Sequence, residues 1–220
     1  MLWARLGLEF PYNEFRACWR MGGDALVQRL GDKNYSWQAV ASLVPDMIAA
    51  GLLGHIYTCP DMIGGGQFGS FLDVDQSKMD QELIVRSCEI HALMPMMQFS
   101  VAPWRILDKE HLDALLESVR IRQSQIDYIM KLVQQASETG EPVVAPMEYR
   151  FPNKGYARIT DQFMLGPDVM VSPMVSPGRS RTVVLPEGKW ESDDGRILQG
   201  PCTITENVPL ERLPYYRLVK

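Results

Sequence analysis

The sequence predicts two structural classes in one chain: an α/β part over residues 1–150 and an all-β part over residues 151–220. Up to Gly140, short apolar runs alternate with longer segments of helical spacing, which favours parallel βα units of an open sheet or of a (β/α) barrel. After Pro142, prolines and glycines separate short runs rich in β-branched residues, which favours a small antiparallel sandwich or sheet. The boundary is expected between Gly140 and Asp161.

Composition limits the class of protein. The chain has 220 residues, of which 46% are hydrophobic, so it can bury a substantial core. Its formal net charge is −5 and its basic residues are scattered, which excludes a basic surface for nucleic acid or anionic membranes. Charges interrupt the first twenty residues, and no window supplies the roughly 18 apolar residues of a membrane span.

Three helices are predicted in the α/β part. The first begins after the N-cap candidate Ser36 and ends at Gly51, and Pro45 is expected to break or restart it. The second begins near Asp80. The third is long: it begins after Asp108 and ends at Gly140.

Two apolar runs of the α/β part read as strands. LLGHIYTCPD predicts a buried strand that delivers Asp61 to the glycine-rich loop MIGGGQFGS, and ALMPMMQFSVAPW is the second run. In the all-β part, the expected strands lie in VMVSPM, RTVVLP, GKWESDDG, PCTITENVP and YYRLVK.

Several features receive structural rather than chemical interpretations. Gly64 to Gly66 lack the spacing of a phosphate-binding loop and predict a flexible loop. The three histidines, His55, His91 and His111, have no metal-ligand spacing around them, so packing or solvation is expected. The four cysteines, Cys18, Cys59, Cys88 and Cys202, form no CxxC pair and indicate neither a zinc site nor a disulfide scaffold.

Two aspartates differ from these features. Asp32 and Asp61 each lie where parallel βα units place the carboxyl end of a strand or its loop, the edge at which barrel enzymes gather their reacting groups. Position alone leaves a capping or turn role open for Asp32. Arg16 either neutralises a nearby carboxylate or holds a surface ion pair, and the pattern does not choose between them.

Five segments of the sequence resemble segments of one known enzyme family. LGDKNYSW resembles the LGDN-x-x-x-W segment of glycoside hydrolase family 31, the retaining α-glycosidases that include α-glucosidases and α-xylosidases. YTCPDMIGG is similar to its GADIGGF strand, and ASETGEPVVAP to its HETGLPVMRP helix end. DQFMLGPDVMVSPMVSPG and VVLPEGKW are similar to its segments DDQFLLGDSLLVAPVLEEG and VYLPEGTWYD. These similarities follow the family's own order along the chain.

The resemblance implies a fold and a mechanism. Residues 1–150 would be the C-terminal part of a (β/α)8 TIM barrel, and residues 151–220 the small antiparallel β-sandwich domain that follows it. Asp32 matches the general acid/base, while Arg16 and Asp61 match residues that bind the sugar hydroxyls; Arg29 is a further binding candidate. A nearby anionic nucleophile should raise the pKa of Asp32. The substrate is then an α-linked oligosaccharide or glycoside, and no metal or organic cofactor is required.

Departures from the family's pattern point to a shifted substrate. TCPDMIGGG and ALMPMMQFSVAPW resemble most the wording of the myogenesis-regulating glycosidase branch. That branch is associated with α-galactosides. Gln98, Phe99 and Ser100 stand where the family often has RNH, Arg29 stands at a common tryptophan, and Gly65 at an aromatic residue.

The resemblance also implies a missing part. The family's nucleophile lies in a KxD segment upstream of Arg16, and no such segment occurs here. We therefore expect a carboxyl-terminal fragment that is inactive alone and that complements the N-terminal part of the same barrel. Relatives work in secretory compartments, at membranes or in bacterial cytoplasm; the resemblance suggests the endoplasmic reticulum lumen or a membrane-anchored lumenal position.

Three alternatives stay open. The first is a non-catalytic sugar-binding or regulatory fragment, the second an unrelated open-sheet enzyme that uses Asp32 and Asp61 for other acid/base chemistry, and the third a remnant without function.

Overall fold

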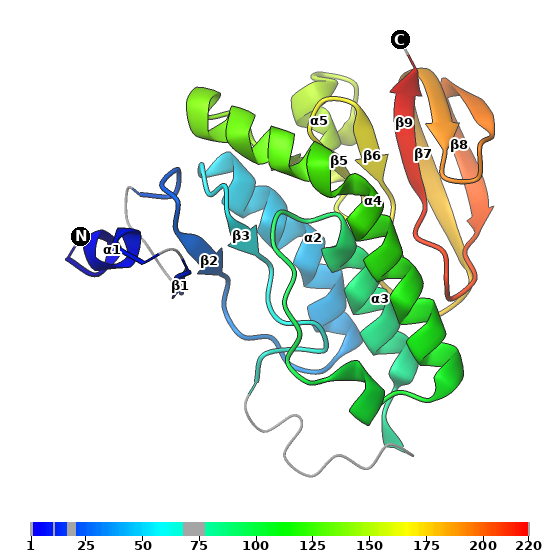
Figure 1. Ribbon diagram of the computed structural model, residues 1–220. Helices are drawn as coiled ribbons and strands as arrows, with labels where there is room; N and C mark the ends of the chain where they lie inside the picture. The colour runs from blue at the N-terminus through cyan, green and yellow to red at the C-terminus, as the bar shows by residue number, and fades with distance from the viewer. Residues whose placement is uncertain (1, 11, 17–20, 68–77, 220) are drawn as a thin grey trace.

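The computed structural model describes residues 2–10, 12–16, 21–67 and 78–219. It contains two sheets, and helices α2, α3 and α4 lie between them (Figure 1). Cys18 of the sequence analysis, and the part of the glycine-rich loop after Gln67, lie outside the described residues. No helix among the described residues is both long enough and apolar enough to cross a membrane.

The first sheet is parallel and small. Its strands β1 (Glu14–Phe15), β2 (Val27–Arg29) and β3 (Thr58–Cys59) lie in chain order. Glu14 pairs with Val27, and Arg29 pairs with Cys59. The predicted parallel pairing of the α/β part is thus confirmed. A short helix, α1 (Leu2–Leu8), precedes β1.

Helix α2 (Trp37–Leu52) connects β2 to β3. Its N-cap is Ser36, as predicted, and the Ser36 hydroxyl accepts a hydrogen bond from the Ala39 amide at 3.2 Å. The predicted break at Pro45 is wrong, because the helix continues through it. Val44 and Met47 on either side of the proline are buried, and this packing offsets the lost backbone hydrogen bond.

Helix α3 (Gln81–Ala92) begins where it was predicted to begin, and α4 (Lys109–Thr139) follows both of its predicted limits. Asp80 caps α3 by accepting from the Leu83 amide, and Asp108 caps α4 by accepting from the His111 amide. Gly140 ends α4 in the left-handed conformation, with φ of 77°, where a glycine meets no Cβ penalty.

The segment from Leu93 to Phe99 corrects one prediction, since it forms no strand. It runs beside β3 with two isolated contacts: the Met96 amide donates to the Thr58 carbonyl, and the Ile63 amide donates to the Gln98 carbonyl. Only a single bridge, Ile63 to Phe99, is formed. Pro95 has no amide hydrogen to donate, which limits ladder formation here. A 3₁₀ helix, η3 (Pro103–Arg105), then leads to α4.

The second sheet is antiparallel and has six strands in the order β4-β5-β6-β9-β7-β8. They are β4 (Val144–Ala145), β5 (Phe163–Leu165), β6 (Val169–Val171), β7 (Ser180–Ser192), β8 (Ile197–Asn207) and β9 (Tyr215–Val219). Between β4 and β5 lie the short helices α5 (Met147–Arg150) and η4 (Tyr156–Arg158).

The sheet confirms the predicted antiparallel strand pairing. It does not form the predicted sandwich of two separate sheets. Strand β9 pairs with β6 on one side and with β7 on the other, so the described strands are hydrogen-bonded into one sheet. RTVVLP and GKWESDDG, expected as two strands, are one strand with an irregularity between Leu185 and Gly188. The division at residue 150 stays a prediction, although Val144 and Ala145 already pair with this sheet.

The main core lies between the helices and the antiparallel sheet. Buried residues of α2, α3 and α4 pack against Phe163, Leu165, Val169 and Val171 of β5 and β6. A separate cluster of buried residues forms around Trp190 and Tyr216 and includes Met164 of β5 and Met170 of β6.

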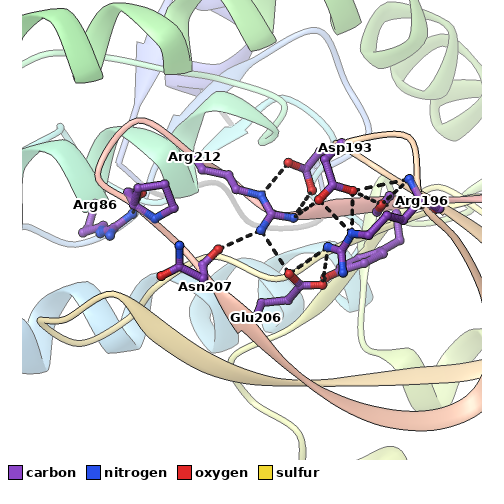
Figure 2. Close-up of polar contacts among 10 residues, drawn as sticks. Arg86, Asp193, Arg196, Glu206, Asn207 and Arg212 are labelled. Carbon is purple, nitrogen blue, oxygen red and sulfur yellow. Dashed lines mark hydrogen bonds and ion pairs between the residues drawn. The ribbon is translucent and has the colours of Figure 1, made fainter.

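Hydrogen bonds from arginine side chains hold the loops of the antiparallel sheet in place. Arg86 of α3 is completely buried and donates to the carbonyl oxygens of Val208, Pro209 and Gly178 at 2.8, 3.2 and 3.1 Å. Figure 2 shows a second network, in which Arg212 lies between Asp193 and Glu206. These contacts tie helix α3 and the loop after β8 into one packed unit.

Candidate active site

The three parallel strands bring the predicted residues together. Arg16 directly follows β1, while Asp32 and Asp61 lie in the loops that follow β2 and β3. Because parallel strands present their carboxyl ends at one edge of a sheet, these loops are neighbours. A guanidinium nitrogen of Arg16 lies 2.7 Å from a carboxylate oxygen of Asp32, so two residues from different strands form an ion pair.

Arg29, the last residue of β2, occupies the centre of the cluster. Its Nη1 donates to Asp32 Oδ1 at 2.8 Å and to Asp61 Oδ1 at 3.3 Å. Its Nε donates to Glu14 Oε1 at 2.9 Å. The structure therefore joins all four residues proposed from the sequence and adds a fifth.

Glu14 is the residue that sequence reasoning missed. It lies two positions before Arg16, a spacing that places both side chains on one face of an extended segment. That spacing was the available sequence signal, but the pairing with Arg29 depends on the register of β1 against β2, which no motif reports.

The five side chains differ in accessibility. Arg16, Asp32 and Glu14 are exposed by 50%, 39% and 37%, whereas Arg29 is exposed by 10% and Asp61 not at all. Solvent therefore reaches two carboxylates and one guanidinium directly. The other two groups lie beneath them.

The buried Asp61 carboxylate is fully engaged. Its Oδ2 accepts from the backbone amides of Lys33 at 2.7 Å and Gly66 at 2.9 Å, and its Oδ1 faces Arg29. A Cβ built at Gly66 would lie 2.5 Å from Asp61 Oδ1 and 2.6 Å from Asp32 Oδ1. The third glycine of the run is thus required for close approach, whereas the sequence predicted only a flexible loop.

The backbone of Asp61 is also held by buried side chains. His91 is fully buried, with Nε2 2.9 Å from the Asp61 carbonyl oxygen and Nδ1 2.6 Å from the Ser87 carbonyl oxygen. The Cys59 thiol donates to the same Asp61 carbonyl at 2.8 Å, and burial raises the pKa of this thiol to about 12. His91 thus has the packing role predicted for it, and Cys59 stays a thiol.

The pKa of Asp32 is governed by the two arginines beside it. The hydrogen bond from Arg16 lowers the pKa of Asp32 below its ordinary value; desolvation opposes this, and Arg29 reinforces it. Among the described residues the shift is thus downward, because two cations lie against the carboxylate. The upward shift expected from a nearby anionic nucleophile stays a prediction. Burial would lower the pKa of Arg29, but its hydrogen bonds to Glu14, Asp32 and Asp61 outweigh that effect and raise it.

A cavity of about 440 Å³ adjoins the cluster. Glu14 lines it together with Val27 of β2, Cys59 of β3 and the Met96 to Gln98 segment. Apart from Glu14, Asn13 and Gln98, its lining is formed mainly by apolar or aromatic side chains. Among the described residues, no group of three or more His, Cys, Asp and Glu side chains is arranged to hold a metal ion.

Comparisons with known proteins identify similar sequences. Residues 140–217 match the model of the glycosyl hydrolase family 31 C-terminal domain. The myogenesis-regulating glycosidase of Mus musculus is 31% identical over 217 residues, which is 94% of this chain and 30% of that protein. An alpha-glucosidase of Saccharolobus solfataricus is 29% identical over 190 residues, 82% of this chain and 27% of its own length.

A solved structure resembles the whole fold. The cycloalternan-degrading enzyme from Trueperella pyogenes superposes with a TM-score of 0.85 at 24% identity, over 96% of this chain and 32% of that one. The chain thus spans less than a third of the length of each of these three proteins. Through its C-terminal domain, and through relatives that align along most of its length, the chain belongs to glycosyl hydrolase family 31.

Proposed function

We propose that the protein containing this chain hydrolyses O-glycosidic bonds of α-glycosides with retention of configuration, and that α-galactosides are its preferred substrates. The observation that carries the proposal is the meeting of Asp32, Arg16 and Asp61 at the carboxyl ends of three parallel strands. Barrel enzymes place their reacting groups at this edge. The similarity to the mouse myogenesis-regulating glycosidase supports the choice of class.

The roles follow from the chemistry. Retaining hydrolysis uses two carboxyl groups about 5 to 5.5 Å apart, one as nucleophile and one as acid, then base. Asp32 is the acid/base, since it is partly exposed and reachable by a glycosidic oxygen. Arg16 binds sugar hydroxyls beside it, and the resemblance assigns the same role to Asp61.

The nucleophile is proposed to come from another part of the protein. Asp61 is buried with both oxygens engaged by Lys33, Gly66 and Arg29, so it is badly placed for attack on an anomeric carbon. A second anionic carboxylate close to Asp32 would raise the pKa of Asp32 against the effect of Arg16, which an acid catalyst near neutral pH requires.

We further propose that the parallel strands and their helices are the C-terminal part of a (β/α)8 barrel. The cavity lined by Glu14, Val27, Cys59 and Met96 is then a surface against which the remaining barrel strands pack. The chain alone is expected to be inactive, and adding the N-terminal part of the same protein should restore turnover. We place the protein in the lumen of the secretory pathway, which cell fractionation tests.

The test is hydrolysis of paired chromogenic α-galactoside and α-glucoside substrates by the full-length protein. Faster turnover of the galactoside supports the proposal. Faster turnover of the glucoside or of an α-xyloside favours the α-glucosidase or α-xylosidase alternative, which the Saccharolobus solfataricus relative supports. Turnover by the 220-residue chain alone would contradict the fragment proposal.

A second candidate is a non-catalytic sugar-binding fragment. The observation that favours it is the double ion pair of Asp32, whose lowered pKa keeps the carboxylate charged and therefore unsuited to proton donation. A folded full-length protein that binds galactose or glucose, cleaves no glycoside, and binds equally well after Asp32→Asn would establish it.

A further inference from the structure

We propose that Arg29 is a positioning residue for the reaction proposed above: anchored by Glu14, it fixes the Asp32 carboxylate beside Asp61 and does not itself contact the sugar. This inference rests on the proposed function for its catalytic meaning. It differs from the substrate-binding role that the resemblance gave to Arg29.

Accessibility is the first argument. The Arg29 side chain is exposed by 10%, while Arg16, the other arginine of the cluster, is exposed by 50%. A sugar hydroxyl can therefore reach Arg16 far more readily than Arg29. The Arg29 guanidinium instead donates its hydrogen bonds to carboxylates of the protein.

The arrangement of those donors is the second argument. Nη1 bridges Asp32 and Asp61, and the neighbouring Nε holds Glu14. A guanidinium is planar and its donors are fixed relative to one another, so anchoring one nitrogen orients the others. Glu14 on β1 thereby sets the direction from which Arg29 reaches Asp32.

Charge is the third argument. Three carboxylates surround Arg29, and two of them share one of its nitrogens. Without the guanidinium, Asp32 and Asp61 would repel each other, and Arg16 alone would hold the Asp32 carboxylate. Arg29 thus keeps Asp32 at a single position between two cations.

Packing closes the arrangement from the other side. The backbone of Gly66 lies against Asp61, Asp32 and Arg29, so close that a Cβ there would come within 3.2 Å of Arg29 Nη1. Its amide also donates to Asp61. Arg29 and Gly66 together therefore hold the two aspartates in place, and Glu14 holds Arg29 through its Nε.

The test compares Arg29→Gln, Arg29→Lys and Glu14→Gln in the full-length protein, with Arg120→Gln as control. Arg120 is an exposed arginine paired with Glu117 on helix α4, so its loss should leave catalysis unchanged. A positioning residue acts on the chemical step: Arg29→Gln should lower kcat about 100-fold with KM nearly unchanged, as misplacement of a reacting group does. Arg29→Lys should recover part of this loss, and Glu14→Gln should show a smaller loss of the same kind.

The pH profile provides an independent readout. An acid catalyst works in its protonated form, and loss of a neighbouring cation raises the pKa of a carboxyl group. The basic limb of the kcat profile should therefore move to higher pH in Arg29→Gln. A raised KM with unchanged kcat would show that Arg29 contacts the sugar, and would overturn the proposal.

Failure of the proposed function is distinguishable from failure of this inference. Carbon-13 NMR titration of Asp32 in the 220-residue chain needs no turnover. A rise of the Asp32 pKa in Arg29→Gln, with a smaller rise in Glu14→Gln, supports the positioning role even if the wild-type protein cleaves no glycoside. An unchanged Asp32 titration in both variants overturns it, and Glu14→Gln carries the test if Arg29→Gln does not fold.

Discussion

The guanidinium of Arg16 lies 2.7 Å from the carboxylate of Asp32, although the two residues follow different strands of the parallel sheet. This ion pair is the largest cause of the lowered Asp32 pKa. We predict that Arg16→Gln raises that pKa, measured by carbon-13 NMR titration in the chain. Arg120→Gln is the control and should leave it unchanged.

The same pair has a consequence for stability, and its sign is fixed. A carboxyl group with a depressed folded pKa contributes stability above its unfolded pKa and loses it as the pH falls through the folded value. Any stability difference between wild type and Arg16→Gln should therefore be present at pH 7 and shrink in acid. A difference that grows as the pH falls would contradict this assignment.

Gly66 provides a steric prediction. Gly66→Ala introduces a Cβ within 2.6 Å of oxygens from both Asp32 and Asp61, so these side chains must shift. We expect a loss of about 1 to 3 kcal/mol in the free energy of unfolding, by denaturant titration. Gly31→Ala is the matched control, because a Cβ at Gly31 meets nothing within 4 Å. Equal effects of the two substitutions would refute the close-packing interpretation.

Arg86 provides a prediction about the attachment of helix α3 to the antiparallel sheet. Arg86→Met leaves the carbonyl oxygens of Val208, Pro209 and Gly178 without this donor. It also leaves the buried Glu89 carboxylate unpaired. Since removing one partner of a buried ion pair costs about 3 to 5 kcal/mol, we expect a loss of at least about 3 kcal/mol in the free energy of unfolding. Arg120→Met, on the exposed face of α4, should change it by less than about 0.5 kcal/mol. A loss below about 1 kcal/mol in Arg86→Met would show that these hydrogen bonds contribute little.

Glu89, which accepts from Arg86 at 2.8 Å, provides a pH dependence. Burial raises the pKa of Glu89 to about 8, and Arg86 opposes the shift. A group whose folded pKa is raised contributes stability below its unfolded pKa and loses it as the pH rises through the folded value. The free energy of unfolding should therefore fall between about pH 5 and pH 8, relative to Glu89→Gln, which cannot titrate. Parallel pH profiles for the two proteins would contradict the raised pKa.

The sequence predicted the helices well because their ends are encoded locally. Ser36, Asp80, Asp108 and Gly140 each satisfy backbone groups within a few residues of themselves, so their types and positions identify the ends. The predicted break at Pro45 failed because the burial of its neighbours on α2 outweighs the tendency of proline to interrupt a helix. The strand predicted before Phe99 is absent for a related reason: Leu93 and Met94 of this run are buried in the main core, so their hydrophobic character reflects packing and not strand pairing.

The candidate site was predictable only in part. The motif around Asp32 and the strand before Asp61 identified residues that the fold brings together. Glu14 and Gly66 were missed because their roles depend on strand register and on the approach of a loop backbone, which are properties of the folded chain. The lowered pKa of Asp32 has the same origin, since its largest cause, Arg16, follows a different strand and reaches Asp32 only in the folded chain.

The central claim is that Asp32 donates the proton to the departing glycosidic oxygen. The most direct test is Asp32→Asn in the full-length protein, assayed with one activated aryl α-glycoside and one α-linked disaccharide. Because general acid catalysis contributes about 10² to 10⁴ in rate and matters most for a poor leaving group, the disaccharide should lose at least about 100-fold. The aryl glycoside should lose much less in its first, glycosylation step. Equal retention of both activities in a folded Asp32→Asn protein would contradict the assignment.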